Sequence, residues 1–90
     1  MPTHITLTAA MTFKEPVDAT VLDALAALAA AVRQEPGCLE YSAHVHTQDP
    51  RRVLFYERWQ DQAALGVHGA AAALTNFRAA MDARLAGPSH

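Results

Sequence analysis

The chain has 90 residues, a mass of 9.7 kDa and a formal net charge of −2, which is enough for one domain over residues 1–90 and too little for two. Its seven basic side chains are outnumbered by nine acidic ones, and this composition argues against nucleic-acid binding. Cys38 is the single cysteine, which excludes an internal disulfide and a zinc-finger framework.

The longest uninterrupted apolar run covers residues 24–32, far fewer than the roughly 20 residues that a membrane-spanning helix needs. Residues 1–4 lack the charged start and apolar core of a signal peptide. We therefore expect a cytoplasmic protein with no membrane segment. Because so short a chain builds only a small core, we also expect it to associate with itself.

The first predicted element is a β-strand over residues 4–13, where apolar side chains alternate with more polar ones. A helix follows, and two starts for it are open: a capping box from Thr20 to Asp23, or Asp18 as the cap. The Pro-Gly pair at 36–37 ends this helix. Its predicted apolar stripe recurs at helical spacing and comprises Val21, Leu22, Leu25, Leu28, Ala29 and Val32.

Two further strands are predicted over residues 38–47 and 53–59. One face of the second strand is expected to carry Leu39, Tyr41, Ala43 and Val45. In the third strand one face carries Val53, Phe55, Glu57 and Trp59, and the other carries Leu54, Tyr56 and Arg58. Both faces of this strand hold large side chains, and one layer of helices covers only one face. The sequence therefore predicts that a partner subunit covers the other.

The last predicted helix starts at Asp61 and is expected to bend or break near His68 and Gly69, because glycine weakens a helix. Beyond this point Leu74, Phe77, Met81 and Leu85 form an apolar stripe. The resulting order, β-α-β-β-α, predicts an α+β fold in which an antiparallel sheet carries its helices on one face.

Three motifs occur in a fixed order: Glu-Pro-Gly-Cys-x-x-Tyr at 35–41, Glu-x-Trp at 57–59, and His68, nine residues after Trp59. Together they resemble the antibiotic biosynthesis monooxygenase domain family over about residues 4–85. The resemblance implies a ferredoxin-like domain that forms a homodimer of the dimeric α/β-barrel type. Members of the family oxidise quinols, polyketide aromatics or similar substrates without metal or flavin; some related members degrade haem, and others have no established activity.

The sequence departs from the family pattern in three places. The family has a fourth strand after the last helix, and nothing near the end of this sequence reads as one. A second histidine, often found about five residues after the first, is replaced by Ala73. The asparagine that haem-degrading relatives carry in the first strand is absent, and Thr6 and Thr8 stand in that region. The absence of this asparagine makes haem breakdown the weaker prediction, while the missing strand and the missing second histidine favour a non-catalytic protein of the same fold.

The resemblance implies that His68 is a general base and that Trp59 forms a pocket wall against an aromatic substrate. Both side chains are expected to converge on one hollow. The other predicted substrate-binding residues are Tyr41, Phe55, Glu57 and Phe77. Each has a plainer interpretation: the aromatic residues as core, His68 as a helix-end histidine, and Glu57 as the structural partner of Arg33 or Arg78.

His44 and His46 lie on the same side of the second predicted strand, but no third metal ligand is evident nearby. We therefore expect no metal and no bound cofactor. The function implied is that of a cofactor-independent monooxygenase that oxidises a quinol-like or polycyclic phenolic substrate with O2. The alternative is a non-catalytic, dimeric small-molecule-binding or accessory protein of the same fold.

Overall fold

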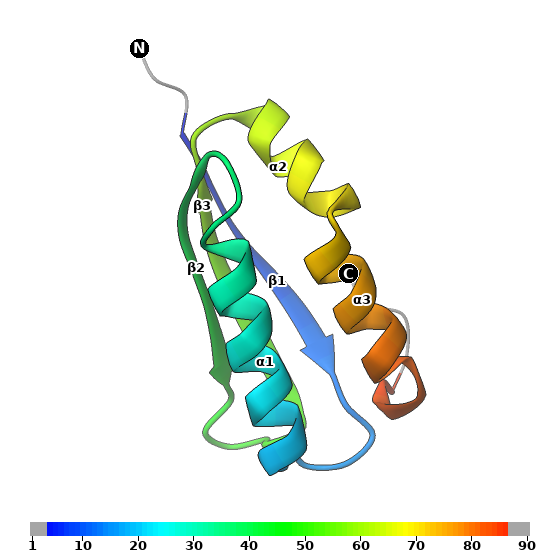
Figure 1. Ribbon diagram of the computed structural model, residues 1–90. Helices are drawn as coiled ribbons and strands as arrows, with labels where there is room; N and C mark the ends of the chain where they lie inside the picture. Colours follow the sequence, from blue (N-terminus) through cyan, green and yellow to red (C-terminus); the bar gives the residue numbers. More distant parts are fainter. Residues whose placement is uncertain (1–3, 87–90) are drawn as a thin grey trace.

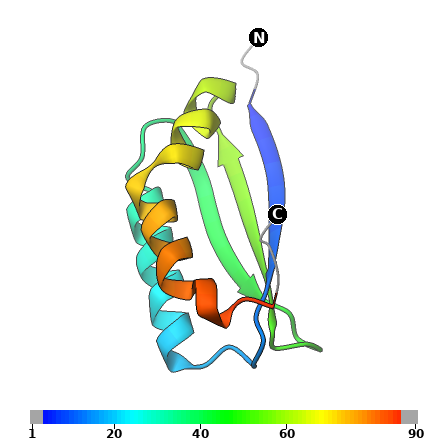
Figure 2. The same cartoon turned by 90° about the vertical axis from the view of Figure 1, so that its right-hand side faces the viewer.

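The computed structural model describes residues 4–86. It contains a three-stranded antiparallel sheet in the order β1-β3-β2, and Figures 1 and 2 show that all the helices lie on one face of this sheet. This arrangement confirms the predicted α+β, ferredoxin-like fold with three strands. In chain order the elements are β1 (Ile5–Thr12), α1 (Ala19–Val32), β2 (Cys38–Val45), β3 (Arg52–Trp59), α2 (Gln62–Ala70), α3 (Ala72–Met81) and the 3-10 turn η1 (Asp82–Arg84).

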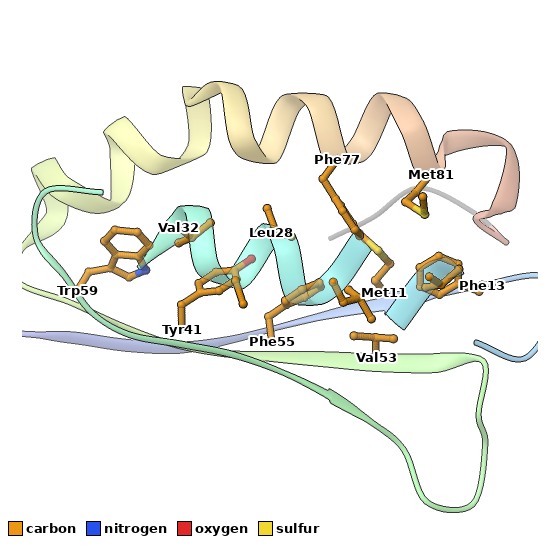
Figure 3. Close-up of a cluster of buried hydrophobic side chains, with 13 residues drawn as sticks. Met11, Phe13, Leu28, Val32, Tyr41, Val53, Phe55, Trp59, Phe77 and Met81 are labelled. Carbon is orange, nitrogen blue, oxygen red and sulfur yellow. The ribbon is translucent and has the colours of Figure 1, made fainter. Parts of the chain in front are cut away.

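The central strand β3 alternates between buried and more exposed side chains along its length, as predicted. Its inner side chains, from Val53 to Trp59, contact the layer of helices. Figure 3 shows the resulting core, which extends from Trp59 at one end of the domain to Phe13 at the other. The outer side chains of β3 include Leu54, which is 42% exposed. The sheet therefore has one covered face and one bare face.

The pairing of β2 with β3 shifts between Cys38 and Glu40, so β2 contains one extra residue at this point. Such a bulge reverses the side-chain alternation of a strand. As a result Leu39 is 44% exposed, while Tyr41 is only 2% exposed. The prediction that Leu39 shares the inner face with Tyr41 is therefore wrong, and Cys38 packs against the core instead.

Helix α1 is capped by Asp18, whose Oδ1 accepts a hydrogen bond from the backbone N–H of Val21 at 2.9 Å. Of the two predicted starts, Asp18 is thus the one observed. The buried stripe of α1 is narrower than predicted, because Leu22 is 50% exposed. Helix α1 packs against β2 and lies beside α3 (Figure 1).

The predicted break in the last helix is present, two or three residues later than expected. Ala71 has an extended conformation, with φ −74° and ψ 152°, and separates α2 from α3. Helix α3 buries Leu74, Phe77 and Met81. None of the helices within residues 4–86 has the length and apolar character needed to cross a membrane.

After η1 the backbone returns to the outer edge of β1. Leu85 forms an isolated antiparallel bridge with Phe13, and the N–H of Ala86 donates to the carbonyl of Thr12 at 2.9 Å. This contact lies where a fourth strand would begin to pair with β1. Within residues 4–86 no strand covers the rest of that edge.

Candidate functional site

The predicted motif at 35–38 forms a tight turn between α1 and β2. The backbone N–H of Cys38 donates to the carbonyl of Glu35 at 3.1 Å. Pro36 occupies the second position, and Gly37 occupies the third with φ +82°. Proline followed by a residue of positive φ is the signature of a type II turn, in which glycine avoids the strain that a side chain would cause.

This turn packs directly on α2. The N–H of Gln60 donates to the carbonyl of Gly37 at 2.8 Å, and a Cβ atom added to Gly37 would lie 2.5 Å from the Cβ of Ala64. Ala64 and His68 are four residues apart and therefore share one face of α2. The close contact at Gly37 thus brings the neighbouring Glu35 within reach of His68.

His68 is the buried residue of α2 and is only 4% exposed. Its Nδ1 lies 2.9 Å from Oε1 of Glu35. The imidazole stacks on the indole of Trp59, with ring centroids 4.7 Å apart and planes 28° apart. The ring of Tyr41 meets the imidazole at a steep angle, with centroids 5.5 Å apart. Two strands and one turn therefore hold the ring in place.

Glu57 is buried beside this stack. Its Oε1 accepts a hydrogen bond from Nε1 of Trp59 at 3.0 Å and lies 3.8 Å from Nε2 of His68. The predicted arginine partners are wrong: Arg33 donates to the backbone carbonyl of Tyr41, and no ion pair joins Arg78 to Glu57 within residues 4–86. Glu57 and Trp59 are two residues apart on the same face of β3, so the indole N–H is the nearer donor.

A cavity of about 40 Å³ lies between the sheet and α3, next to the imidazole. Four of the predicted site residues line it, namely Tyr41, Phe55, Glu57 and His68. The remaining lining residues are Ala9, Ala10, Met11, Leu74 and Arg78. The structure therefore brings one predicted base and three predicted binding residues together at a single cavity.

Trp59 and Phe77 do not line this cavity. The indole of Trp59 is in direct contact with the imidazole, so the predicted hollow between the two rings does not exist. Phe77 lies behind Phe55, with ring centroids 6.5 Å apart. Both side chains support the residues that form the cavity wall.

Burial raises the pKa of the Tyr41 phenol above its ordinary value of 10, and the carboxylates of Glu57 and Glu35 raise it further. Tyr41 is therefore a neutral O–H group at physiological pH. Burial likewise raises the pKa of the Cys38 thiol, with a smaller contribution from Glu35. A protonated thiol is a poor nucleophile, so Cys38 is better suited to packing than to chemistry.

His44 on β2 and His46 in the following turn were considered as possible metal ligands, and within residues 4–86 no third ligand lies beside them. Nε2 of His44 contacts the hydroxyl of Ser42 at 2.8 Å. Nδ1 of His46 accepts backbone hydrogen bonds from Gln48 and Asp49. In the part of the chain that the structure describes, no group of three or more potential ligands is placed to hold a metal ion.

Two charged residues at the site were not among the predicted site residues. Glu35 contacts His68 across 33 positions of sequence, and Arg78 lines the cavity from α3. The Glu-Pro-Gly motif pointed to Glu35, but only as part of a turn. Arg78 lies four residues after Leu74 on α3, so helical spacing alone would have placed it on the same side as a buried residue.

The family model for antibiotic biosynthesis monooxygenases matches residues 4–82. The chain is similar to the solved structure of SO0527 from Shewanella oneidensis, at 33% identity and a TM-score of 0.82, with 97% of this chain and 84% of that chain covered. It is also similar to PA3566 from Pseudomonas aeruginosa, at 33% identity and a TM-score of 0.78, with 97% and 87% covered.

A crystal structure described as an antibiotic biosynthesis monooxygenase is 28% identical, with a TM-score of 0.76 and coverage of 96% of this chain and 92% of that chain. The search of curated proteins gives no match. The family model covers nearly the whole described domain, including the turn at Glu35, the strand that carries Glu57 and Trp59, and His68. The chain belongs to the antibiotic biosynthesis monooxygenase family.

Proposed function

We propose that this protein is a cofactor-independent monooxygenase that oxidises a quinol-like or polycyclic phenolic substrate with O2. The observation that carries the proposal is the position of His68, a buried imidazole fixed at Nδ1 by Glu35 and lining a cavity beside Glu57. A histidine held in this way is suited to general base catalysis near neutral pH. Membership of the family supports the same reaction class.

In the proposed reaction, Nε2 of His68 removes the proton of a phenolic hydroxyl. The electron-rich phenolate then reduces O2 and forms a C–O bond with one of its oxygen atoms. The proton held by His68, together with the hydrogen displaced from that carbon, leaves with the second oxygen atom as water. A phenol with a free ring position and one O2 thus give one quinone and one water, so the substrate itself supplies the electrons.

Three further side chains of the cavity have proposed roles. Tyr41 remains a neutral O–H donor because of its raised pKa, and it would donate a hydrogen bond to a substrate oxygen. Arg78 lies on the solvent side of the same cavity, where its guanidinium would attract the phenolate. Phe55 would contact the aromatic rings of the substrate.

The cavity must enlarge before an aromatic substrate fits. Its volume of about 40 Å³ is close to the roughly 30 Å³ that one water molecule occupies in the liquid. Pockets for small organic ligands measure about 300 Å³ or more. Leu74 and Arg78 line the cavity from α3, beside the edge of β1 that no strand covers within residues 4–86. We propose that the substrate enters by displacing these two side chains.

A second candidate function is a non-catalytic small-molecule-binding or accessory protein. The tight packing of the imidazole between Trp59 and Tyr41 favours it, as does Ala73 in place of a second histidine. Larger hollows lie elsewhere, including one of about 230 Å³ on the bare face of the sheet, lined in part by His44 and Leu54. That hollow contains no buried titratable pair comparable to Glu35 and His68.

An isotope experiment distinguishes the two functions. The protein is incubated with a polycyclic phenol that has a free ring position, under oxygen-18 gas, and the product is analysed by mass spectrometry. A monooxygenase gives a quinone that carries one labelled oxygen, at a rate above that of a protein-free sample. A rate equal to that of the protein-free sample for a panel of quinols and phenols would leave the binding protein as the better interpretation.

We also propose that the protein acts as a homodimer that covers the bare face of the sheet. Leu54 and the half-buried Tyr56 lie on this face. Large, partly apolar side chains that lie together on an exposed face are typical of an interaction surface. Glu40 and Arg58, also on this face, form an ion pair with 3.6 Å between charged atoms. Because each subunit presents the same mixed surface, two copies related by a twofold axis would cover it.

A further inference from the structure

The carboxylate of Glu35, in the turn after α1, contacts the imidazole of His68 on α2. The two atoms, Oε1 and Nδ1, are 2.9 Å apart. The side chains are only 15% and 5% exposed, so solvent screens this contact poorly. We propose that Glu35 is the positioning residue of His68: it holds the proton on Nδ1 and leaves the lone pair of Nε2 facing the cavity. The inference rests on the proposed function, in which Nε2 is the base.

The backbone makes this contact difficult to avoid. Gly37 adopts a conformation that other residues rarely adopt, and it lies against Ala64 with no room for a side chain. The turn is therefore fixed relative to the first turn of α2, and His68 follows one helical turn later. Glu35 has little freedom to move away from Nδ1 while this packing is intact.

The chemistry of the two groups assigns the proton. An ionised carboxylate only accepts hydrogen bonds, so the nitrogen beside it carries hydrogen in the neutral imidazole. Nε2 is then the unprotonated nitrogen. The nearest carboxylate oxygen to Nε2 is Oε1 of Glu57 at 3.8 Å, beyond hydrogen-bond distance, and that oxygen already accepts from Trp59.

The stack with Trp59 fixes the plane of the ring, but it does not choose between the two nitrogens. The stacked indole contacts the flat face of the imidazole in either tautomer, and no hydrogen bond joins Tyr41 to a ring nitrogen within residues 4–86. Glu35 is thus the group within residues 4–86 that distinguishes Nδ1 from Nε2. It also stabilises the imidazolium that forms when Nε2 accepts a proton, in the way that a carboxylate supports the histidine of a catalytic triad.

A purely structural role for Glu35 predicts different results. In that case the contact would attach α2 to the rest of the domain, and its loss would lower the melting temperature without selecting a tautomer. The two roles are separated by the nitrogen NMR spectrum of the imidazole, because the Nδ1–H and Nε2–H forms give distinct chemical shifts and couplings.

The experiment compares the wild-type protein with Glu35→Gln, Glu35→Leu and the control Glu15→Gln, which changes an exposed carboxylate. The His68 nitrogens are observed at mildly alkaline pH, with His68→Phe used for assignment, and turnover is measured with the same phenolic substrates. We expect the Nδ1–H form in the wild type and in Glu15→Gln, and loss of the preference for this form in Glu35→Leu. We expect turnover to fall by roughly 10²-fold in Glu35→Leu, because the imidazole is no longer held in position, and to fall less in Glu35→Gln, whose amide oxygen can still accept from Nδ1–H.

An Nε2–H form of His68 in the wild type would overturn the inference, as would an unchanged Nδ1–H form in Glu35→Leu. Turnover that stays constant in both Glu35 variants while the melting temperature falls would also overturn it, in favour of a structural contact. Failure of the proposed function has another signature. In that case the wild type oxidises nothing, while the NMR spectrum still shows an Nδ1–H form that depends on Glu35.

Discussion

Trp59 and His68 stack on one another with their ring centroids 4.7 Å apart, and this contact joins the end of β3 to α2. The indole N–H is directed to Glu57 on its own strand, while the imidazole Nδ1 is directed to Glu35 on the turn before β2. One buried and one half-buried carboxylate therefore flank one pair of rings. The candidate site depends on this arrangement, because it holds the imidazole through Nδ1, while Nε2 has no hydrogen-bond partner within residues 4–86.

Replacing His68 with alanine is expected to lower turnover by roughly 10²-fold or more if the imidazole is the general base. Because the substitution also leaves a space beside Trp59, His68→Phe is needed as a second variant that keeps an aromatic ring in the stack. We expect both variants to lose activity, and His68→Phe to have the higher melting temperature. His4→Ala, which removes an exposed histidine, is the control, and oxygen uptake is the measurement. Normal turnover in both His68 variants would remove this residue from the mechanism.

Gly37→Ala is expected to destabilise the fold by about 1–3 kcal/mol, because it combines positive φ with a steric clash. The clash is with the Cβ of Ala64, so Ala64→Gly should recover part of the loss in the double variant and leave the φ strain. Gly66→Ala is the control, since nothing lies within 4 Å of its added Cβ. That change should stabilise α2 by roughly 0.5–1 kcal/mol. Urea unfolding of the four variants measures these differences, and a neutral Gly37→Ala would show that the turn is not under the constraint described.

Asp18→Ala is expected to lower the melting temperature at neutral pH by removing the cap of α1. The hydrogen bond from the backbone of Val21 lowers the pKa of Asp18 below its ordinary value of 3.8, with a smaller contribution from Arg84. A lowered pKa in the folded state means that the contribution to stability is complete above pH 3.8 and is lost as the pH falls through the folded value. The difference between wild type and variant should therefore shrink in acid. Thr20→Ala, which removes the rival cap, should have little effect at any pH.

Leu54→Asp is expected to convert the proposed dimer into a monomer, because the new carboxylate would be buried without a partner in the interface. Sedimentation should give about twice 9.7 kDa for the wild type and the monomer mass for the variant. Val67→Asp is the matched control, since Val67 is exposed on α2, away from the bare face. A wild type that sediments as a monomer at micromolar concentration would contradict the proposal. Equal loss of the dimer in both variants would place the interface elsewhere.

The sequence predicts those features of the fold that depend on local periodicity. The alternation of β3 and the buried stripe of α3 are visible in the sequence. Side-chain environments recur every second residue in a strand and every three to four residues in a helix. The position of Leu39 was not predictable in this way. A bulge depends on how β2 aligns with β3, and an alternating pattern continues through a bulge without any mark in the sequence.

The candidate site was predictable in its residues and less so in its contacts. His68, Tyr41, Phe55 and Glu57 do meet at one cavity, and all of them except Phe55 belong to the motifs that carry the family resemblance. The partner of Glu57 was not predictable, since charge pairing favours arginine while the strand geometry favours the indole N–H. The contact between Glu35 and His68 depends on the packing of a turn against a helix, which no spacing rule describes.

Trp59 is the single tryptophan of the chain, and its ring is in face-to-face contact with the imidazole. Its ultraviolet emission therefore originates at one known point, beside the proposed base. A molecule that enters the cavity, or a proton that binds the imidazole, would change the intensity or the wavelength of this emission. Trp59 is thus an intrinsic fluorescence reporter, and occupancy of the cavity can be followed in real time without an attached dye.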